Sequence, residues 1–374
     1  MVISIPSERQ SGETRTVLTA ANAAKLAGWG LEVRVERGAG AAAGVPDSDL
    51  SRAGAVIVGD RRELLAAADI VLRVRKPTPE EVGWLKPGSV HVSFLDPFNE
   101  KPLVAALAAK GVSAISLELI PRTTRAQKMD ALSSQANLAG YVAVLLAANH
   151  SPKIFPMMTT PAGTISPARV LVIGAGVAGL QAIATARRLG ARVEAYDTRP
   201  VVEEQVRSLG AKFLQIQLGE TGQTKDGYAR ALTEEQLAQQ RQAMKRFCAD
   251  ADVVITTAQV FGRRAPVIVT AEMVAAMRPG SVIVDGAIES GGNVEGAEPG
   301  RISERNGVTI VALPNLPGRV PVHASQVLSN NLVALLEEFW DKAARRLALR
   351  LEDEILQGCL VTHDGKIRDE RFRA

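Results

Sequence analysis

The sequence is poor in cysteine, in aromatic residues and in long apolar runs. Two cysteines occur among 374 residues, Cys248 and Cys359, in no spacing that metal or redox motifs use. This scarcity argues against a disulfide framework and fits a reducing compartment. Aromatic residues make up 4% of the chain, and its scattered basic residues, with a net charge of +4, lack the aromatic interleaving that stacking on bases needs. We therefore expect no nucleic-acid partner.

The sequence shows neither an export signal nor a membrane span. Residues 1–15 carry charge where a signal peptide would place its apolar region. Of the two most apolar stretches, residues 170–186 are broken by glycines and contain Gln181, and residues 139–148 are too short. The four histidines lack carboxylates or cysteines at ligand spacing, so no metal site is indicated. We expect no direct membrane insertion, and any connection to a membrane must come through a partner.

The strongest local signal lies in residues 170–197. An apolar run stops at Gly174, Gly176 and Gly179 follow at GxGxxG spacing, and apolar residues then recur at helical period. This order of strand, tight turn and helix is typical of a backbone that accepts a pyrophosphate at a helix N-terminus. A second predicted strand ends at Asp197, whose carboxylate suits adenine ribose hydroxyls and repels a 2′-phosphate. The pattern predicts an NAD site, with a purely structural turn as the alternative.

Strand and helix signals alternate along the chain in two halves. The first half has apolar or β-rich runs at residues 2–5, 31–36, 55–58, 70–74, 90–94 and 112–117. The second half has them at residues 170–173, 192–196, 212–215, 253–256, 282–285 and 308–312. Such alternation predicts parallel sheets. We expect an α/β fold of two Rossmann-like, doubly wound domains, residues 1–132 with 326–374 and residues 133–325, separated by a cleft and joined by long helices.

Helical patterns occupy the stretches between the predicted strands. They cover residues 14–27, 61–67, 101–109, an apolar run at 136–148 and a long stretch at 325–349. The tail beyond residue 350 is polar, and we expect it to end the chain without apolar anchors. Residues 216–230, rich in glycine and polar residues, predict either a lid beside the dinucleotide site or a plain surface insertion.

A polar segment before the apolar run at 136–148 carries the candidate chemistry of the nicotinamide side. Hydride transfer between two nicotinamides needs the rings held together and dry more than it needs acid or base groups. Arg122 and Asp130 are predicted to pair, and Gln127 offers a donor and an acceptor to ribose or carboxamide. Ser133 lies close by at the helix entry. The alternative is that Asp130 or Ser133 only caps the helix that follows.

Several stretches together resemble the NAD(H)-binding component, of the separate alpha-1 type, of proton-translocating NAD(P) transhydrogenase. They are PRTTRAQKMDALSSQANLAGY, the glycine fingerprint with Asp197, the pair Gly227 and Tyr228, ESGGN at residues 289–293, and LEDEILQGCLVTHDGK near the end. The resemblance covers nearly the whole chain. Its most specific part is RAQKMD with the following SSQ, because a generic Rossmann protein does not need that segment.

The resemblance implies a role for each matching residue. Arg122, Gln127, Asp130 and Ser133 correspond to the nicotinamide side, where hydride transfer takes place. Gly227 and Tyr228 correspond to a mobile loop that closes on NAD(H). The remaining cofactor-binding candidates serve the pyrophosphate, the adenosine and the end of the fourth strand of the second domain: Gly174, Gly176, Val177, Gly179, Asp197, Thr198, Arg199, Ala258 and Gln259.

The resemblance also implies partners. The family moves hydride from NADH to NADP⁺, with Si specificity on this side, and couples the transfer to proton movement across a membrane. This chain would hold only NAD(H), so NADP(H) and the proton channel are expected on NADP(H)-binding and membrane-spanning partner subunits. A homodimer of this chain is also implied, with a cytoplasmic position on the inner face of the cytoplasmic membrane through those partners.

Two alternatives remain beside this interpretation. Alanine dehydrogenase shares the two-domain plan, but it uses a lysine in a VKEP-like strand end and a histidine in a YLH-like one. Here those positions read Arg75 within VRKP and Asp96 within FLD. The proton-handling histidine is thus missing, and arginine does not readily give up a proton. The other alternative is a non-catalytic NAD-binding regulator, in which the polar segment at 122–133 would be superfluous.

Overall fold

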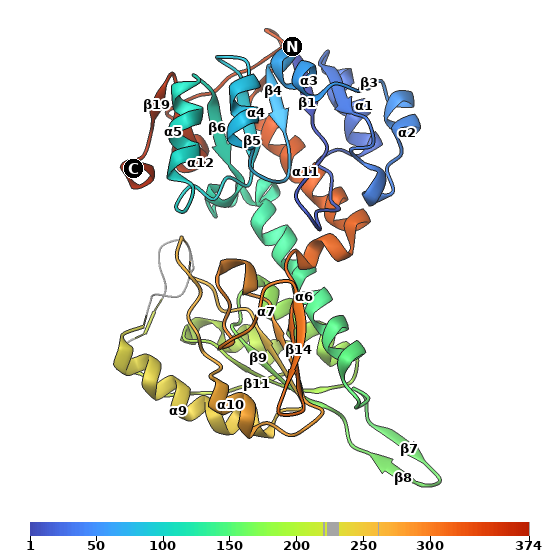
Figure 1. The fold of residues 1–374 in the computed structure, drawn as a ribbon, viewed down its shortest axis with the longest axis vertical. Coiled ribbons are helices and arrows are strands. Elements are labelled where there is room, and N and C mark those ends of the chain that lie inside the picture. Colours follow the sequence, from blue (N-terminus) through green and yellow to red (C-terminus); the bar gives the residue numbers. More distant parts are fainter. Residues whose placement is uncertain (220, 223–231, 261, 374) are drawn as a thin grey trace. The chain divides into compact units, whose positions relative to one another are not determined.

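The computed structural model describes residues 1–219, 221–222, 232–260 and 262–373. The chain forms two compact units, Met1–Gln135 with Gly318–Ala374, and Ala136–Pro317 (Figure 1). Each is an α/β unit with a mostly parallel sheet, which confirms the predicted fold class. Helix α6, Ala131–His150, begins in the first unit and ends in the second.

The sheet of the first unit has eight strands within the described residues, in the order β19-β18-β6-β5-β4-β1-β2-β3. The strands are β1 (Val2–Ile5), β2 (Glu32–Glu36), β3 (Val56–Val58), β4 (Ile70–Leu72), β5 (Val90–Ser93), β6 (Ser113–Ser116), β18 (Leu360–His363) and β19 (Lys366–Ile367). Strands β1 to β6 pair in parallel. The central strands β4, β5 and β6 are buried at every position, which is why their sequences read as continuous runs rather than as alternations.

The helices of the first unit begin where side chains cap them. They are α1 (Ala20–Gly28), α2 (Asp47–Arg52), α3 (Arg61–Ala67), α4 (Pro79–Trp84), α5 (Lys101–Ala109), α11 (Pro321–Phe339) and α12 (Glu354–Cys359). Helix α1 starts later than predicted because the Thr19 hydroxyl accepts from the Asn22 N–H and fixes the N-terminus there. Helix α11 ends at Phe339, where β16 (Trp340–Asp341) turns back to pair with β17 (Arg346–Leu347).

The tail beyond residue 350 is anchored, so the expectation of a tail without apolar anchors is wrong. Leu356 in α12 and Val361 in β18 are buried, and the ring of Phe372 packs edge-on against Phe98 with centroids 5.0 Å apart. Strand β18 pairs antiparallel with β6. These apolar residues lie singly between polar ones, so the composition of the segment hides them.

The sheet of the second unit has seven strands among the described residues, in the order β11-β10-β9-β12-β13-β15-β14. They are β9 (Arg169–Ile173), β10 (Arg192–Tyr196), β11 (Lys212–Phe213), β12 (Val253–Thr256), β13 (Val282–Asp285), β14 (Arg301–Arg305) and β15 (Val308–Ala312). Six pair in the parallel, doubly wound order that the sequence predicts. The seventh, β14, is an antiparallel edge strand that the sequence analysis missed.

Helices cover both faces of this second sheet. They are α7 (Val177–Arg188), α8 (Glu203–Ser208), α9 (Glu234–Asp250) and α10 (Ala271–Ala276). Leu171 and Ile173 of β9 belong to a core cluster with Met244 of α9 and Met273 of α10, on the face where Figure 1 shows these two helices. Because side chains alternate along a strand, the residues between them face the other side. Burial on both faces leaves the carboxyl ends of the strands as the edge where loops can form a site.

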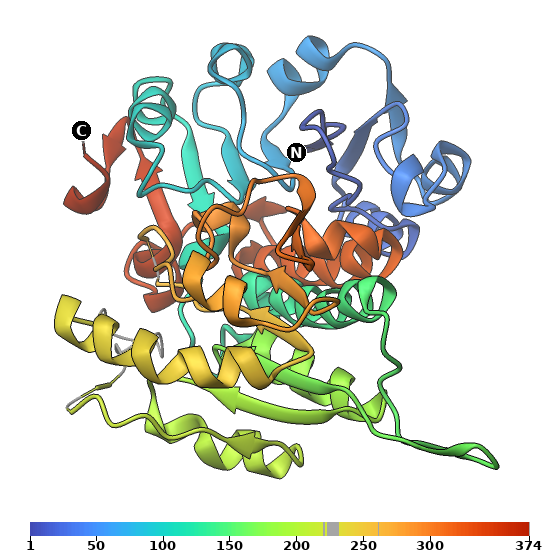
Figure 2. The ribbon, with the colours of Figure 1, turned by 60° about the horizontal axis from the view of Figure 1, so that its bottom comes forward.

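A separate hairpin leaves the body of the second unit. Strands β7 (Met158–Thr160) and β8 (Gly163–Ile165) pair only with each other among the described strands, and Figures 1 and 2 show them extending away from the rest of that unit. All six residues of the two strands are exposed.

Helix α6 differs from the sequence-based expectation of no membrane span. It is 20 residues long with a mean hydropathy of 1.3, and within the described part of the chain it is the one helix long and apolar enough to cross a membrane. The apolar stretch considered from the sequence is extended by its first turns, which contain Ser134 and Gln135. Gln135 donates to the Ala324 carbonyl in the first unit, and Gly140 lies so close to Ala178 in the second that a Cβ would overlap its carbonyl oxygen. Both halves of α6 thus pack against the chain's own helices.

Candidate functional site

Two of the three fingerprint glycines are required by the protein's own geometry. Gly174 ends β9 with a φ of +96°, and a Cβ there would lie 2.9 Å from the Thr257 hydroxyl, which donates to the Gly174 carbonyl. Gly179 faces this turn from α7, and a Cβ would overlap the Gly174 carbonyl oxygen. Any other residue at either position would strain the turn or push the helix away from the strand.

The middle glycine is different. Gly176 has a φ of −76°, which every residue can adopt, and a Cβ there would meet only the Arg199 Nη2, at 4.0 Å, among the described residues. The position lies directly before Val177, the first residue of the 12-residue helix α7. The first N–H groups of a helix and its dipole attract an anion. The missing side chain therefore keeps open the place where a phosphate can approach the backbone.

Asp197 follows β10 and lies beside this turn. Its Oδ2 accepts from the Ala175 N–H at 2.7 Å and from the Arg199 Nη2 at 2.8 Å. Its Oδ1 accepts from the Arg199 N–H at 2.8 Å and from the Arg199 Nε at 2.9 Å. The hydrogen bonds to Asp197 raise the pKa of the Arg199 guanidinium. Sequence and structure thus bring an acid, an arginine and the glycine turn together in one place.

The loop after β12 is held by an asparagine that the sequence analysis did not single out. Asn293 is fully buried; its Nδ2 donates to the carbonyls of Ala258 and Pro266, both at 2.8 Å, and its Oδ1 accepts from the Ala258 N–H at 3.1 Å. The N–H of Asn293 in turn donates to the buried carboxylate of Asp285 at 2.9 Å. Gln259, next along the chain, is exposed. The signal for Asn293 was the ESGGN stretch, whose contacts no local pattern reveals.

The candidate arm lies in the first unit. Gln127 begins the short helix η3 (Gln127–Met129), and both Gln127 and Arg122 are exposed. The Asp130 carboxylate accepts from the Ser133 N–H at 2.8 Å and from the Ser133 hydroxyl at 2.5 Å. It therefore caps helix α6, and the expected pairing of Asp130 with Arg122 is not what the structure has.

Helix α11 anchors this arm from behind. The Asn331 Nδ2 donates to the Lys128 carbonyl at 2.9 Å, and its Oδ1 accepts from the Ser134 hydroxyl at 2.7 Å. Met129 is fully buried between the exposed residues of η3. The exposed side chains of the arm thus project from a fixed backbone, and Asn331 is a positioning residue that sequence spacing alone does not identify.

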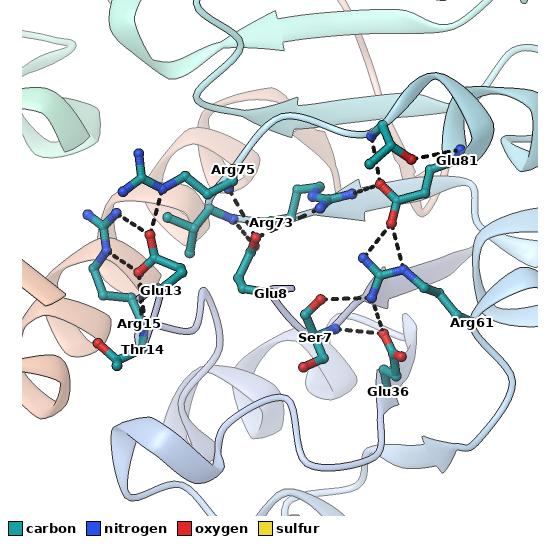
Figure 3. Close-up of polar contacts among 12 residues, drawn as sticks. Ser7, Glu8, Glu13, Thr14, Arg15, Glu36, Arg61, Arg73, Arg75 and Glu81 are labelled. Atoms are coloured by element: carbon teal, nitrogen blue, oxygen red, sulfur yellow. Dashed lines mark hydrogen bonds and ion pairs between the residues drawn. The ribbon is translucent and has the colours of Figure 1, made fainter. Parts of the chain in front are cut away.

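The carboxyl edge of the first sheet is filled by the protein's own ion pairs, which Figure 3 shows. Glu13 accepts from Arg15 Nη2 at 2.7 Å and from Arg75 Nε at 2.6 Å, and Arg15 also donates to Gln135 at 2.9 Å. Burial raises the pKa of Glu13, yet the hydrogen bonds and charges of Arg15 and Arg75 outweigh it and lower the pKa to about 2. Both arginines are thus already matched by an internal carboxylate.

A second part of the same network lies around Glu81. This carboxylate binds Arg73 at 2.8 Å and Arg61 at 2.5 Å, while Arg61 also binds Glu36 at 2.5 Å. Burial raises the pKa of Glu81, but the charge of Arg73 and further hydrogen bonds lower it to about 2. The edge that could hold a ligand in the first unit is therefore occupied by buried, mutually neutralised charges.

Two predicted residues, Gly227 and Tyr228, lie outside the described residues. The remaining candidates fall into two groups: the arm in the first unit, and the turn, acid and β12 loop in the second. In the second unit the geometry offers what a dinucleotide needs, namely an open glycine at a helix N-terminus and a carboxylate after the next strand. In the part of the chain that the structure describes, no group of three or more metal-ligating side chains occurs.

Comparison with known proteins decides the family. The model of the alanine dehydrogenase/PNT N-terminal domain matches residues 4–139, and that of the alanine dehydrogenase/PNT C-terminal domain matches residues 143–370. The chain belongs to the alanine dehydrogenase/PNT family. The predicted family resemblance is thereby confirmed.

Within the alanine dehydrogenase/PNT family the chain resembles both named branches. It is 46% identical to the first of the separate alpha-subunit chains of NAD(P) transhydrogenase from Rhodospirillum rubrum, covering 98% of this chain and 97% of that protein. It is 31% identical to alanine dehydrogenase of Mycobacterium tuberculosis, covering 99% and 95%. Among solved structures, a transhydrogenase from Sinorhizobium meliloti matches with a TM-score of 0.85 and 40% identity over 99% of each chain.

Proposed function

We propose that this chain is the NAD(H)-binding subunit of a proton-translocating NAD(P) transhydrogenase. It holds NAD(H) and exchanges hydride directly with NADP(H) on a partner subunit, while other chains move protons across the membrane. The observation that carries the proposal is the open space at Gly176. The protein's own contacts do not require a glycine there, whereas a pyrophosphate lying against the backbone does.

In this proposal the second unit holds the pyrophosphate and adenosine. The residues that serve this role are Gly174, Gly176, Val177, Gly179, Asp197, Thr198, Arg199, Ala258 and Gln259. NAD(H) supplies or accepts the hydride when it is bound, and the chain contributes position. The arm residues Arg122, Gln127, Asp130 and Ser133 contact the nicotinamide side, where their polar groups orient the carboxamide and ribose and help to exclude water.

The strand ends of the first unit argue against alanine oxidation. Asp96, at the position of the dehydrogenase histidine, pairs with Lys76 at 3.6 Å, and its side chain is 46% exposed. Arg75, at the position of the lysine, binds Glu13. Neither residue provides a proton acceptor that titrates near neutral pH, which oxidation of an amino acid requires and direct hydride exchange between nicotinamides does not.

A homodimer is the second component of the proposal. The hairpin carries Met157, Met158 and Ile165 with exposed fractions of 63%, 48% and 48%, next to a short apolar strand pair without a body of its own (Figure 2). On α6 of the same unit Tyr141 and Leu145 are also exposed. Apolar side chains gathered on one unit favour a protein partner. We further propose that partner subunits hold the complex at the cytoplasmic face of the membrane.

The hydride exchange is tested by mixing the purified chain with its NADP(H)-binding partner subunit. We expect NADH-dependent reduction of an NADP⁺ analogue that absorbs at its own wavelength. The control is the chain alone with alanine and NAD⁺, for which we expect no NADH. Absence of exchange together with alanine oxidation would reverse the assignment. Binding of NADH without either reaction would point to a regulator.

The homodimer is tested by sedimentation equilibrium. The unchanged chain should sediment as a dimer, and the double substitution Met157→Glu with Met158→Glu should give a monomer. Val201→Glu, at an apolar side chain of the second unit that is 61% exposed and lies outside the hairpin, is the matched control and should leave the dimer intact. A dimer that tolerates glutamates in the hairpin contradicts this component of the proposal.

A further inference from the structure

Arg199 is a residue that an NAD site does not need. Rossmann sites that take NAD use an acid after the second strand, and sites that take NADP use a nearby arginine to hold the 2′-phosphate. This chain has both side chains, two positions apart, and they are in contact. The question is what an arginine does in a site whose acid already selects NAD.

The contact engages Asp197 completely. A carboxylate offers about four lone-pair directions, and all four are used: one by the Ala175 N–H and three by Arg199 through its N–H, Nε and Nη2. Adenine ribose hydroxyls can reach this carboxylate only by displacing or sharing one of those donors. Arg199 thus occupies, in the absence of nucleotide, the acceptor sites that the ribose uses.

The contact also engages the guanidinium in the way a phosphate would. Nε and Nη2 form two parallel bonds to the two carboxylate oxygens, the same fork geometry with which arginine binds phosphate oxygens. The side chains of Arg199 and Asp197 are 12% and 6% exposed, so water screens the pair only weakly. The Arg199 Nη2 lies 4.0 Å from the Cβ position of Gly176, at the open glycine turn.

The local backbone fixes this arrangement. The Arg199 N–H donates to the Asp197 side chain two residues earlier, which is the turn that aspartate favours, and Pro200 follows and begins the short helix η4 (Pro200–Val202). The guanidinium is therefore held at the mouth of the turn by covalent proximity as well as by charge. Removing the carboxylate charge leaves the arginine in place but frees its fork.

We propose that Asp197 and Arg199 form a paired nucleotide discriminator, in which Asp197 excludes NADP(H) both by repelling its 2′-phosphate and by occupying Arg199. A latent 2′-phosphate site centred on Arg199 follows from this arrangement. The inference rests on the proposed function, because it concerns the adenosine end of the same NAD(H) site. A subunit that must keep to NAD(H) beside a partner that holds NADP(H) gains from a discriminator that cancels its own positive charge.

The test is calorimetric titration of NADH and NADPH into the full chain and three variants. The unchanged chain should bind NADH and bind NADPH at least about 100-fold more weakly. Asp197→Asn should weaken NADH by about tenfold or more and tighten NADPH by about tenfold or more. Adding Arg199→Ala to Asp197→Asn should abolish the gain in NADPH affinity. Arg207→Ala, whose guanidinium is 66% exposed and pairs with Glu203 on α8, is the matched control and should change neither affinity.

The outcomes separate the inference from the proposed function. If the unchanged chain binds no NADH, the proposed function fails. If it binds NADH but Asp197→Asn gains no NADPH affinity, or keeps the gain without Arg199, the discriminator fails alone. Arg199→Ala by itself should leave NADH affinity within about threefold, and a loss of more than about tenfold would make Arg199 a direct NAD ligand and overturn the pairing. Asp197→Ser carries the same expectations should Asp197→Asn not fold.

Discussion

The side chain of Asn293 is bonded to the backbone of Ala258 through both of its polar atoms. Its Nδ2 donates to the Ala258 carbonyl at 2.8 Å and its Oδ1 accepts from the Ala258 N–H at 3.1 Å. A primary amide that satisfies both groups of one residue acts like a neighbouring strand. The loop after β12 is thereby fixed beside the glycine turn, where the Thr257 hydroxyl reaches the Gly174 carbonyl.

Replacing Asn293 by alanine should destabilise the second unit by about 2 to 4 kcal/mol, because buried backbone groups of Ala258 and Pro266 lose their partners. We expect a lower melting temperature in calorimetry and weaker NADH binding. Asn293→Asp is the matched variant: it keeps the size but cannot donate, and it adds a charge near the buried Asp285. It should be at least as destabilising as alanine. A fully stable Asn293→Asp protein would show that the bonds to Ala258 are unimportant.

The three fingerprint glycines provide a test with internal controls. Gly176→Ala should leave the melting temperature nearly unchanged, since its backbone angles suit alanine and its surroundings are open. It should nevertheless weaken NADH binding by about tenfold or more, because the methyl group lies where the phosphate approaches. Gly179→Ala should lower the melting temperature strongly, as its Cβ would overlap the Gly174 carbonyl oxygen. Equal NADH affinity in Gly176→Ala and the unchanged chain would contradict the proposed phosphate position.

The sequence predicted those parts of the fold that rest on local pattern. Strand β10 and helices α3 and α5 were predicted at their observed bounds, because each is bounded by turn or capping residues and carries a regular apolar period. The tail and β14 were not predicted. Strand β18 pairs with β6, some 250 positions away in the chain, and nothing in a local window shows which of its apolar residues face a sheet.

The candidate site divides in the same way. The glycine turn and Asp197 follow from spacing, because a tight turn and a strand end are local features. Asn293 and Asn331 act through contacts with loops distant in sequence, and an asparagine looks the same in a sequence whether it supports a loop or faces solvent. Asp130 shows the converse: its cap on α6 is local, yet the sequence favoured a pairing with Arg122.

Asp130 allows the cap to be separated from the proposed role in hydride exchange. Asparagine caps helices about as well as aspartate, so Asp130→Asn should keep the melting temperature close to that of the unchanged chain. Asp130→Ala removes the cap and should cost about 1 kcal/mol.

If the carboxylate serves the nicotinamide side, Asp130→Asn should slow single-turnover hydride exchange with the partner subunit about tenfold or more, while the dissociation constant of NADH changes by less than about threefold. Gln127→Asn should behave likewise. An exchange rate that is unchanged in Asp130→Asn would reduce Asp130 to a helix cap.

The ion pairs of the first unit predict its behaviour in acid. Glu13 and Glu81 have pKa values of about 2 in the folded chain, against an ordinary value of 4.5. Their contribution to stability is complete above pH 4.5 and is lost as the pH falls toward 2, because the unfolded chain takes up the protons first. All three tryptophans, Trp29, Trp84 and Trp340, belong to the first unit, so tryptophan fluorescence reports on that unit. We expect the urea midpoint followed by fluorescence to drop steadily between pH 4.5 and 2.

Glu13→Gln separates this effect from general acid unfolding. At about pH 7 it leaves Arg15 and Arg75 buried without their carboxylate and should cost about 3 to 5 kcal/mol. Its fluorescence midpoint should then fall less between pH 4.5 and 2 than that of the unchanged chain, since one of the titrating carboxylates is gone. Glu304→Gln, at an exposed position of β14 in the second unit, should reproduce the unchanged pH profile. Parallel profiles for Glu13→Gln and the unchanged chain would mean that Glu13 does not carry the acid sensitivity, and that the charges of Arg15 and Arg75 are balanced by other groups.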